Sequence, residues 1–244
     1  NGGTTTIKGG TVSGGTATEK GGTIYMHTAA GTVNIQSGAK ITGGNAANGG
    51  LLYMAAGKLN MTGGTVGGGT ATNGNTNADN GNGGCFYLAA GSATFSGGTV
   101  NAGTAVKGTD AEGTTVGGSG ATIYAITDFT IDGATIKGGS GRYGGAIYIK
   151  DADLTLNGGT ISGNATANAI SSGGAIFMAS GSTVTMGSST ANPNGATVNG
   201  STVSTNGSAI YVSDKSTLNI NAGTVNGGTC NKGAALYITG STAN

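Results

Sequence analysis

The residues best suited to acid–base chemistry gather in one part of the sequence, with the single arginine among them. They are Asp128, Asp132, Arg142, Lys150, Asp151 and Asp153. If Asp128 and Asp153 hold equivalent positions in successive repeats, they lie about 5 Å apart. Paired carboxyl groups at such a separation cleave glycosidic bonds in many hydrolases. No histidine or second arginine joins them, and a solvated face would carry the same residues, so we predict that the chain is not an enzyme.

Metal chemistry has less support. The segment NGNTNADNG places asparagines at 73, 75 and 77 and then Asp79, a spacing that resembles calcium loops. Calcium sites normally gather several carboxylates, and this one offers only Asp79, so a polar turn fits better. His27, the only histidine, directly follows Met26 and is expected to face solvent. We predict no metal site and no cofactor.

Charge and cysteine content limit the partners. The ten Lys and Arg are scattered singly and the net charge is +1, so no basic patch predicts nucleic-acid binding. No apolar run approaches the roughly 20 residues of a membrane-spanning helix. Cys85 and Cys230 fall in the third and eighth of the repeats described below, too far apart to pair within one chain. Unpaired thiols and pairing between molecules both remain open.

One phrase, of which GGAIYI is an example, recurs eight times and centres on an aromatic residue. The anchors lie 24 to 37 residues apart and are Tyr25, Tyr53, Tyr87, Tyr124, Tyr148, Phe177, Tyr211 and Tyr237. A repeat of this length with variable insertions is typical of solenoids. Seven of the eight tyrosines occupy this position, so the repeat is not an accident of composition.

Each repeat divides into three strand-like phrases. The anchor is followed by a phrase such as DLTL, in which apolar and polar residues alternate, and then by a shorter phrase close to GGTV. Period-two alternation indicates strands, and the Gly-Gly and Asn-Gly pairs between them indicate turns. We therefore predict an all-β, right-handed, three-sided parallel β-helix of about eight coils, forming a single domain over residues 1–244.

The alternation assigns an interior and an exterior to each coil. Ten side chains of the fifth and sixth coils are expected inside: Ile147, Ile149, Leu154, Leu156, Ile161, Ile176, Met178, Val184, Met186 and Val198. Thr and Asn of the second phrase are expected outside, in hydrogen-bonded ladders. The two longest insertions, Gly69 to Asn82 and Gly103 to Gly118, both precede an anchor, which predicts that one corner carries the variable loops.

The anchor aromatics take the outward parity, because the aliphatic residues on either side of them point inward. A column of eight exposed rings about 4.8 Å apart would be a long apolar stripe that must be covered or must bind. We therefore predict a binding or assembly stripe made of the eight anchors. The alternative is a ladder in which the rings only stabilise one another by stacking.

The coils also resemble a known group of proteins. GGAIYI and GGAIFM, together with DLTLNGGTISGN from Asp153, are similar to coils of pectin-lyase-like β-helix proteins on bacterial surfaces. Gly-Gly-Ala-Ile resembles one motif of the chlamydial polymorphic membrane proteins, which are autotransporters, although their companion Phe-x-x-Asn motif is absent. This resemblance implies a β-helix located outside the cell or on the bacterial surface.

These observations favour a non-catalytic, extracellular structural or adhesive solenoid. Its ends carry no capping helix, so we expect either a segment of a longer surface protein or a fibre subunit that associates with itself, end to end or laterally. The alternative is a β-helix that binds or cleaves carbohydrate, with host or environmental glycans as partners. Ice binding is a third reading, since Thr arrays suit it, but Lys58, Asp128 and Asp153 interrupt one face and Lys40 and Lys137 another.

Overall fold

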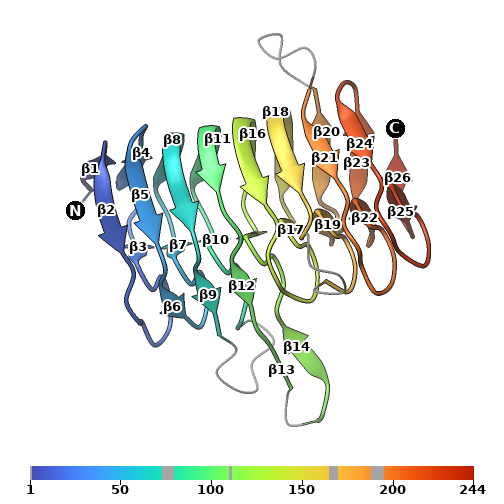
Figure 1. Ribbon diagram of the computed structural model, residues 1–244, viewed down its shortest axis with the longest axis horizontal. Coiled ribbons are helices and arrows are strands. Elements are labelled where there is room, and N and C mark those ends of the chain that lie inside the picture. The colour runs from blue at the N-terminus through green and yellow to red at the C-terminus, as the bar shows by residue number, and fades with distance from the viewer. Residues whose placement is uncertain (1, 73–79, 110–111, 165–169, 188–194) are drawn as a thin grey trace.

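The protein is a stack of parallel β-strands arranged in coils. The computed structural model describes residues 2–72, 80–109, 112–164, 170–187 and 195–244, and these ranges contain 26 strands and no helix. The named strands pair in parallel, except for one small hairpin. Figure 1 shows successive coils following one another along the long axis, from the N-terminal end to the C-terminal end. The predicted all-β parallel β-helix is confirmed, while its right-handed winding and three-sidedness stay predictions.

The anchor phrases form one sheet of eight strands, one from each repeat. In order along the sheet these are β3 (Ile24–Met26), β7 (Leu52–Met54), β10 (Phe86–Leu88), β15 (Ile123–Ala125), β17 (Ile147–Lys150), β19 (Ile176–Ala179), β22 (Ile210–Val212) and β25 (Leu236–Ile238). Each anchor aromatic is in register with the anchors of the adjacent coils, from Tyr25 with Tyr53 to Tyr211 with Tyr237. The eight predicted repeats and their register are confirmed.

A glycine in the left-handed conformation leads the chain into each anchor strand. Gly144 has a φ of 63°, and a Cβ at this position would collide with the carbonyl oxygen of Ile147. The equivalent glycine of every other repeat also has positive φ: Gly21, Gly49, Gly83, Gly120, Gly173, Gly207 and Gly233. Only glycine adopts this backbone at little cost, which explains why the anchor phrase begins with it.

The second and third phrases of all coils join in a single 13-stranded sheet. In four coils the two phrases are one continuous strand: β8 (Lys58–Gly67), β11 (Ser92–Val100), β16 (Phe129–Lys137) and β18 (Asp153–Ser162). Elsewhere the second phrase forms β1 (Thr4–Ile7), β4 (Thr32–Ile35), β20 (Thr183–Met186), β23 (Thr217–Ile220) and β26 (Thr242–Ala243). The third phrase forms β2 (Gly10–Ser13), β5 (Ala39–Thr42), β21 (Thr197–Asn199) and β24 (Thr224–Asn226).

The prediction of a turn between the second and third phrases is therefore wrong for those four coils. The register shifts at Gly97 in β11 and at Asp132 in β16, as it does at a β-bulge. A bulge takes up extra residues and bends the strand without ending the hydrogen-bonded ladder. Glycine suits a bulge as well as a turn, so the two phrases stay connected.

Two smaller elements lie between the third phrase and the next anchor. A three-stranded sheet consists of β6 (Asn45–Ala46), β9 (Thr70–Ala71) and β12 (Thr104–Ala105). After it, β13 (Lys107–Thr109) and β14 (Thr115–Gly117) form an antiparallel hairpin that projects from the stack (Figure 1). The predicted insertion before the fourth anchor thus carries a projecting element. Another insertion, however, separates β20 from β21, so the insertions are not confined to the predicted place in the repeat.

The interior is the one that the alternation predicts. All ten side chains expected inside the fifth and sixth coils belong to one buried hydrophobic core, which runs from Met26 to Leu218. They meet in register, for example Ile147 with Ile176 and Leu154 with Val184. Outside, asparagines form short ladders, with Asn60 donating to Asn34 and Asn226 to Asn199, both at 2.8 Å. Aliphatic layers inside and amide ladders outside thus hold neighbouring coils together.

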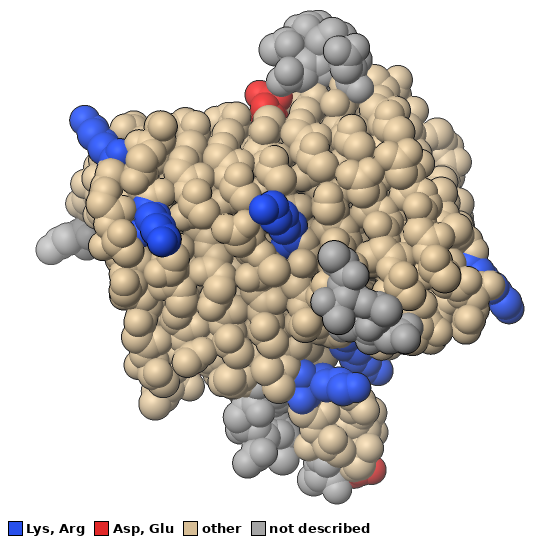
Figure 2. All heavy atoms as spheres, viewed as in Figure 1, with Lys and Arg blue, Asp and Glu red and all other residues tan. Residues whose placement is uncertain are grey.

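The surface carries little charge. Figure 2 shows a face on which Lys and Arg are scattered over the large sheet, and a further group of them lies at the base of the projecting hairpin. In the ranges that the structure describes, no helix could span a membrane.

Candidate functional site

The eight anchor aromatics form a continuous row on the outer side of the anchor sheet. Neighbouring ring centroids lie 4.6 to 5.8 Å apart from Tyr25 to Tyr237. Several neighbours are nearly parallel, with interplanar angles of 8° for Phe177 and Tyr211 and 3° for Tyr124 and Tyr148. The rings are not part of the hydrophobic core, whereas the flanking Ile147 and Ile149 are fully buried in it. The outward parity assigned from the sequence agrees with this placement.

The expectation of eight exposed rings is wrong. Tyr25 is 47% exposed, but Tyr53 and Tyr87 are each 8% exposed and Phe177 is 9% exposed. Rings stacked at such distances cover each other on both faces. Other side chains cover them further, because the Lys20 ammonium lies 5.0 Å from the Tyr53 ring centroid and the Tyr143 ring lies 4.8 Å from that of Phe177. The row is largely a self-covered ladder, and its role in binding or assembly stays a prediction.

Burial also affects the ionisation of three tyrosines of the row. It raises the pKa of the Tyr148 hydroxyl to about 12, with smaller contributions from Asp214 and Tyr143. Burial likewise raises the pKa of the Tyr53 and Tyr211 hydroxyls. These three hydroxyl groups therefore remain protonated at neutral pH and can donate hydrogen bonds.

The carboxylates suspected of acid chemistry have structural contacts. Asp128 and Asp153 hold equivalent positions one coil apart, as predicted, because Phe129 pairs with Leu154. The Asp128 carboxylate accepts a hydrogen bond of 2.8 Å from the backbone N–H of Asp153. Arg142 is directed elsewhere: its guanidinium donates to the carbonyl oxygen of Thr115 at 2.5 Å. The sequence cluster is therefore not assembled around its arginine.

The remaining candidates stand apart from one another. His27 is exposed, as predicted, and its Nδ1 lies 3.4 Å from the Tyr25 hydroxyl. Cys85 and Cys230 are both free, as expected within one chain, and burial raises the pKa of the Cys85 thiol to about 11. The calcium-like segment, residues 73–79, lies outside the described residues. Within the described ranges, no group of three or more His, Cys, Asp or Glu side chains could hold a metal ion.

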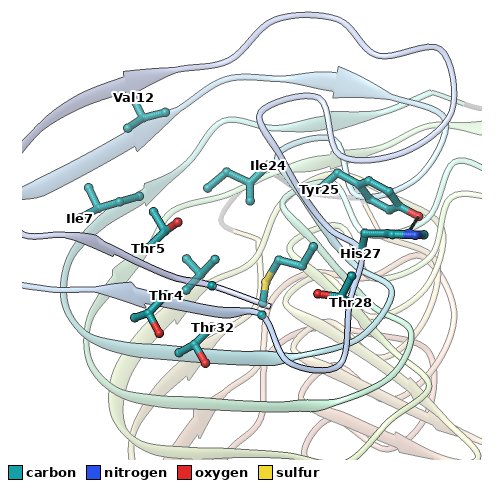
Figure 3. A pocket seen from close by; sticks show the side chains of 13 residues that line it. Thr4, Thr5, Ile7, Val12, Ile24, Tyr25, His27, Thr28 and Thr32 are labelled. Atoms are coloured by element: carbon teal, nitrogen blue, oxygen red, sulfur yellow. Dashed lines mark hydrogen bonds between the residues drawn. The ribbon is translucent and has the colours of Figure 1, made fainter. Parts of the chain in front are cut away.

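A cavity of about 520 Å³ opens at the first coil, which forms one edge of both large sheets. Figure 3 shows side chains from the first coil and the start of the second around it, including Ile7, Val12 and Ile24, with Tyr25 and His27 at one side. Ile7, Val12 and Ile24 also pack against the main hydrophobic core. The cavity is therefore the end of that core rather than a separate site.

A second feature was missed from the sequence and lies around Tyr143, beside the aromatic row. Two adjoining depressions, of about 470 and 330 Å³, share Thr115, Arg142 and Tyr143 in their walls. The first also reaches Lys107, Phe177 and Tyr211, and the second reaches Tyr124, Tyr148, Lys150 and Asp214. A signal was present, since Tyr143 is the only tyrosine outside the anchor position and follows the only arginine.

Comparison of the chain with protein-family models, with curated proteins and with solved structures finds no match. Function must therefore be argued from the fold and from these sites.

Proposed function

We propose that the chain is a non-catalytic structural and adhesive solenoid that acts outside the cell, on a bacterial surface. In this role the coils form a rigid spacer, and the segments that project from them meet the partner. The resemblance of the GGAI-type phrases to bacterial surface β-helices supports the proposed location. Self-association into a fibre stays a prediction, and its lateral form loses support because the aromatic row is mostly covered.

One observation carries this proposal: polar and aromatic side chains on the outside of the coils connect one coil to the next. The Asp128 carboxylate binds the backbone of the next coil, and the aromatic rings stack through all eight repeats. Asparagine amides pair between coils in the same way. Groups used in this manner resist separation of the coils, which is the requirement of a spacer under load.

Polysaccharide cleavage is the alternative reading, and among the acidic candidates from the sequence Asp128 and Asp153 are the pair that lies in equivalent positions of adjacent coils. A reducing-end assay on a broad panel of polysaccharides separates the two functions. We expect no product above buffer from the wild-type chain. Product that disappears in Asp128→Asn and Asp153→Asn variants would overturn the non-catalytic proposal.

Electron microscopy and sedimentation velocity test the mechanical part of the proposal. We expect stiff particles whose length agrees with eight coils at about 4.8 Å each. Flexible or collapsed particles would contradict a spacer. Particles that lengthen in multiples as the concentration rises would establish end-to-end association, whereas a constant length would dismiss a fibre.

A further inference from the structure

The two depressions around Tyr143 differ from the rest of the surface in their charge. Three of the ten Lys and Arg of the chain line them, namely Lys107, Arg142 and Lys150, together with a single carboxylate, that of Asp214. We propose that this surface, called the Tyr143 groove below, binds an extended anionic carbohydrate whose negative groups are uronate carboxylates or sulfate esters. The proposal rests on the adhesive role above and assigns it a ligand class.

The backbone of the groove is fixed by the stacking of coils. Tyr143 forms parallel bridges to Ser119 in the preceding coil and to Ser172 in the following one. The carbonyl oxygen of Arg142 accepts a hydrogen bond of 2.8 Å from the N–H of Ser171. Residues from three coils therefore hold this position before any ligand arrives, and such preorganisation lowers the entropy cost of binding.

The side chains at the centre are also held in place. The Arg142 guanidinium lies 4.6 Å from the Tyr143 ring centroid, and its Nη1 donates to the carbonyl oxygen of Thr115 in the projecting hairpin. The Tyr143 ring also packs against Phe177, at a centroid distance of 4.8 Å. Arg142 has five N–H donors, and Thr115 uses one direction of the fork. These contacts already hold the planar guanidinium in place, so binding a carboxylate or sulfate costs it little further conformational entropy.

The hydrogen-bonding character of the groove determines the ligand class. Its walls include the cationic side chains named above, the two tyrosines Tyr143 and Tyr148, and polar side chains such as Ser172 and Asn206. These groups are mainly donors, and the raised pKa of Tyr148 keeps its hydroxyl protonated. A ligand rich in acceptors and negative charge pairs with such walls, while its own hydroxyls can pair with Ser and Asn.

The geometry favours a carbohydrate over single-stranded nucleic acid, the other common anionic chain. Non-specific binding of single strands depends on open aromatic faces on which bases stack. Here the faces of Tyr148 and Phe177 are taken by each other, at a centroid distance of 5.3 Å, and the Tyr143 ring contacts both the Arg142 guanidinium and the Phe177 ring. The same contacts leave these inner rings little open face on which a sugar could stack. Each depression is within the usual volume of ligand sites, about 300–1,000 Å³, and two that adjoin suit an extended chain.

Isothermal titration calorimetry of the full chain at low salt tests the groove with four probes of defined length. Hexamannuronate carries carboxylates, a chondroitin sulfate hexasaccharide carries sulfates as well, cellohexaose is neutral, and deoxythymidine hexanucleotide is the nucleic-acid control. We expect at least one anionic carbohydrate to bind about tenfold or more tightly than cellohexaose, and its affinity to fall with added salt. Binding of hexamannuronate would show that carboxylates are sufficient for recognition. Binding of the chondroitin sulfate hexasaccharide without binding of hexamannuronate would show that sulfate is required.

Variants locate the binding. Arg142→Gln removes the charge but keeps an amide near Thr115. This variant should bind the anionic carbohydrate about tenfold or more weakly than the wild type does. Lys40→Gln removes one charge from β5, which does not line the groove, and should change the affinity less than about twofold. Circular dichroism melting must show that both variants remain folded. If no carbohydrate binds, if cellohexaose or the hexanucleotide binds as tightly, or if both variants behave alike, the ligand assignment is wrong. None of these results would affect the spacer proposal, which depends on particle shape and on the absence of product.

Discussion

A tyrosine inside the aromatic row keeps its proton because its neighbours exclude water from its charged form. Tyr148 shows this most strongly, with a pKa of about 12 against the ordinary value near 10. The folded state thus favours the neutral hydroxyl more than the unfolded chain does. This part of the stability is fully present below pH 10 and is lost as the pH rises from 10 through 12.

Tyr148→Phe should reduce that alkaline loss. Phenylalanine already occupies the equivalent position as Phe177, so the ring ladder should persist and the stability at pH 8 should stay nearly unchanged. Between pH 10 and 12 the variant should lose less stability than the wild type, by at most about 3 kcal/mol. Denaturant unfolding at pH 8, 10 and 11.5 measures the difference. Identical pH profiles would show that the burial of Tyr148 does not control its ionisation.

At the same scale, the sequence predicted the row but not the groove. Recurrence at one repeat position identified the anchors, and alternation gave their direction. The exposed fraction of the rings could not be predicted in this way, because it depends on ring stacking and on contacts such as that of Tyr143 with Phe177. Tyr143 and Arg142 were recognisable as exceptions to the repeat, but their environment is completed by Lys107 and Thr115 from a hairpin that shows no strand-like alternation.

Glycine pairs decide how the elements of a coil are joined. A Gly-Gly pair next to a strand permits either a turn or a bulge, and its identity alone does not distinguish them. In β18 the chain passes through Gly158 and Gly159 and continues pairing, with Gly159 at a φ of 89°. The anchor strands were predictable because their alternation is clear, whereas this continuity depends on the ladders of the adjacent coils.

Substitution at Gly159 should reveal how tightly the coils approach each other there. Gly159→Ala would force a side chain into positive φ and bring its Cβ into the carbonyl oxygen of Ala134 in the preceding coil. We expect a loss of more than about 3 kcal/mol in the free energy of unfolding. Gly181→Ala is the matched control, since Gly181 has a φ of 73° but nothing within 4 Å of a Cβ.

In the Gly181→Ala control the free energy of unfolding should fall only by the cost of holding alanine at positive φ, about 1–2 kcal/mol. Thermal melts followed by circular dichroism compare the two variants with the wild type. Equal losses would mean that positive φ, and not contact between coils, requires glycine at position 159.

At the scale of the whole molecule, stability accumulates between neighbouring coils. Each layer of the core contacts the layers before and after it, and each ring inside the row contacts the ring before and the ring after it. Such a stack behaves as a one-dimensional array, in which damage to one interface weakens the neighbouring coils first. The aliphatic layers of the core and the outer row of aromatic rings are separate sets of contacts, so they can be perturbed separately.

Replacing Tyr148, Phe177 and Tyr211 together by Ser separates the ladder from assembly. The inward residues of those coils are untouched, so the β signal in circular dichroism should remain. Five ring contacts disappear, including that of Tyr143 with Phe177. Each stacked pair contributes about 0.5–1.5 kcal/mol, so the melting temperature should fall clearly. Tyr25→Ser is the control, because Tyr25 is the exposed end of the row and should cost little.

Sedimentation velocity of the same variants then tests the assembly stripe. Because Phe177 is 9% exposed and its neighbours cover its faces, a second molecule has little ring surface to bury there. We expect the triple variant to have the same particle size as the wild type. Smaller particles with an intact β signal would instead show that the row holds solenoids together, since an aromatic side chain buried at an interface can contribute about 2 kcal/mol or more. Loss of the β signal would mean that the rings support the core directly, and the outward parity would then be wrong.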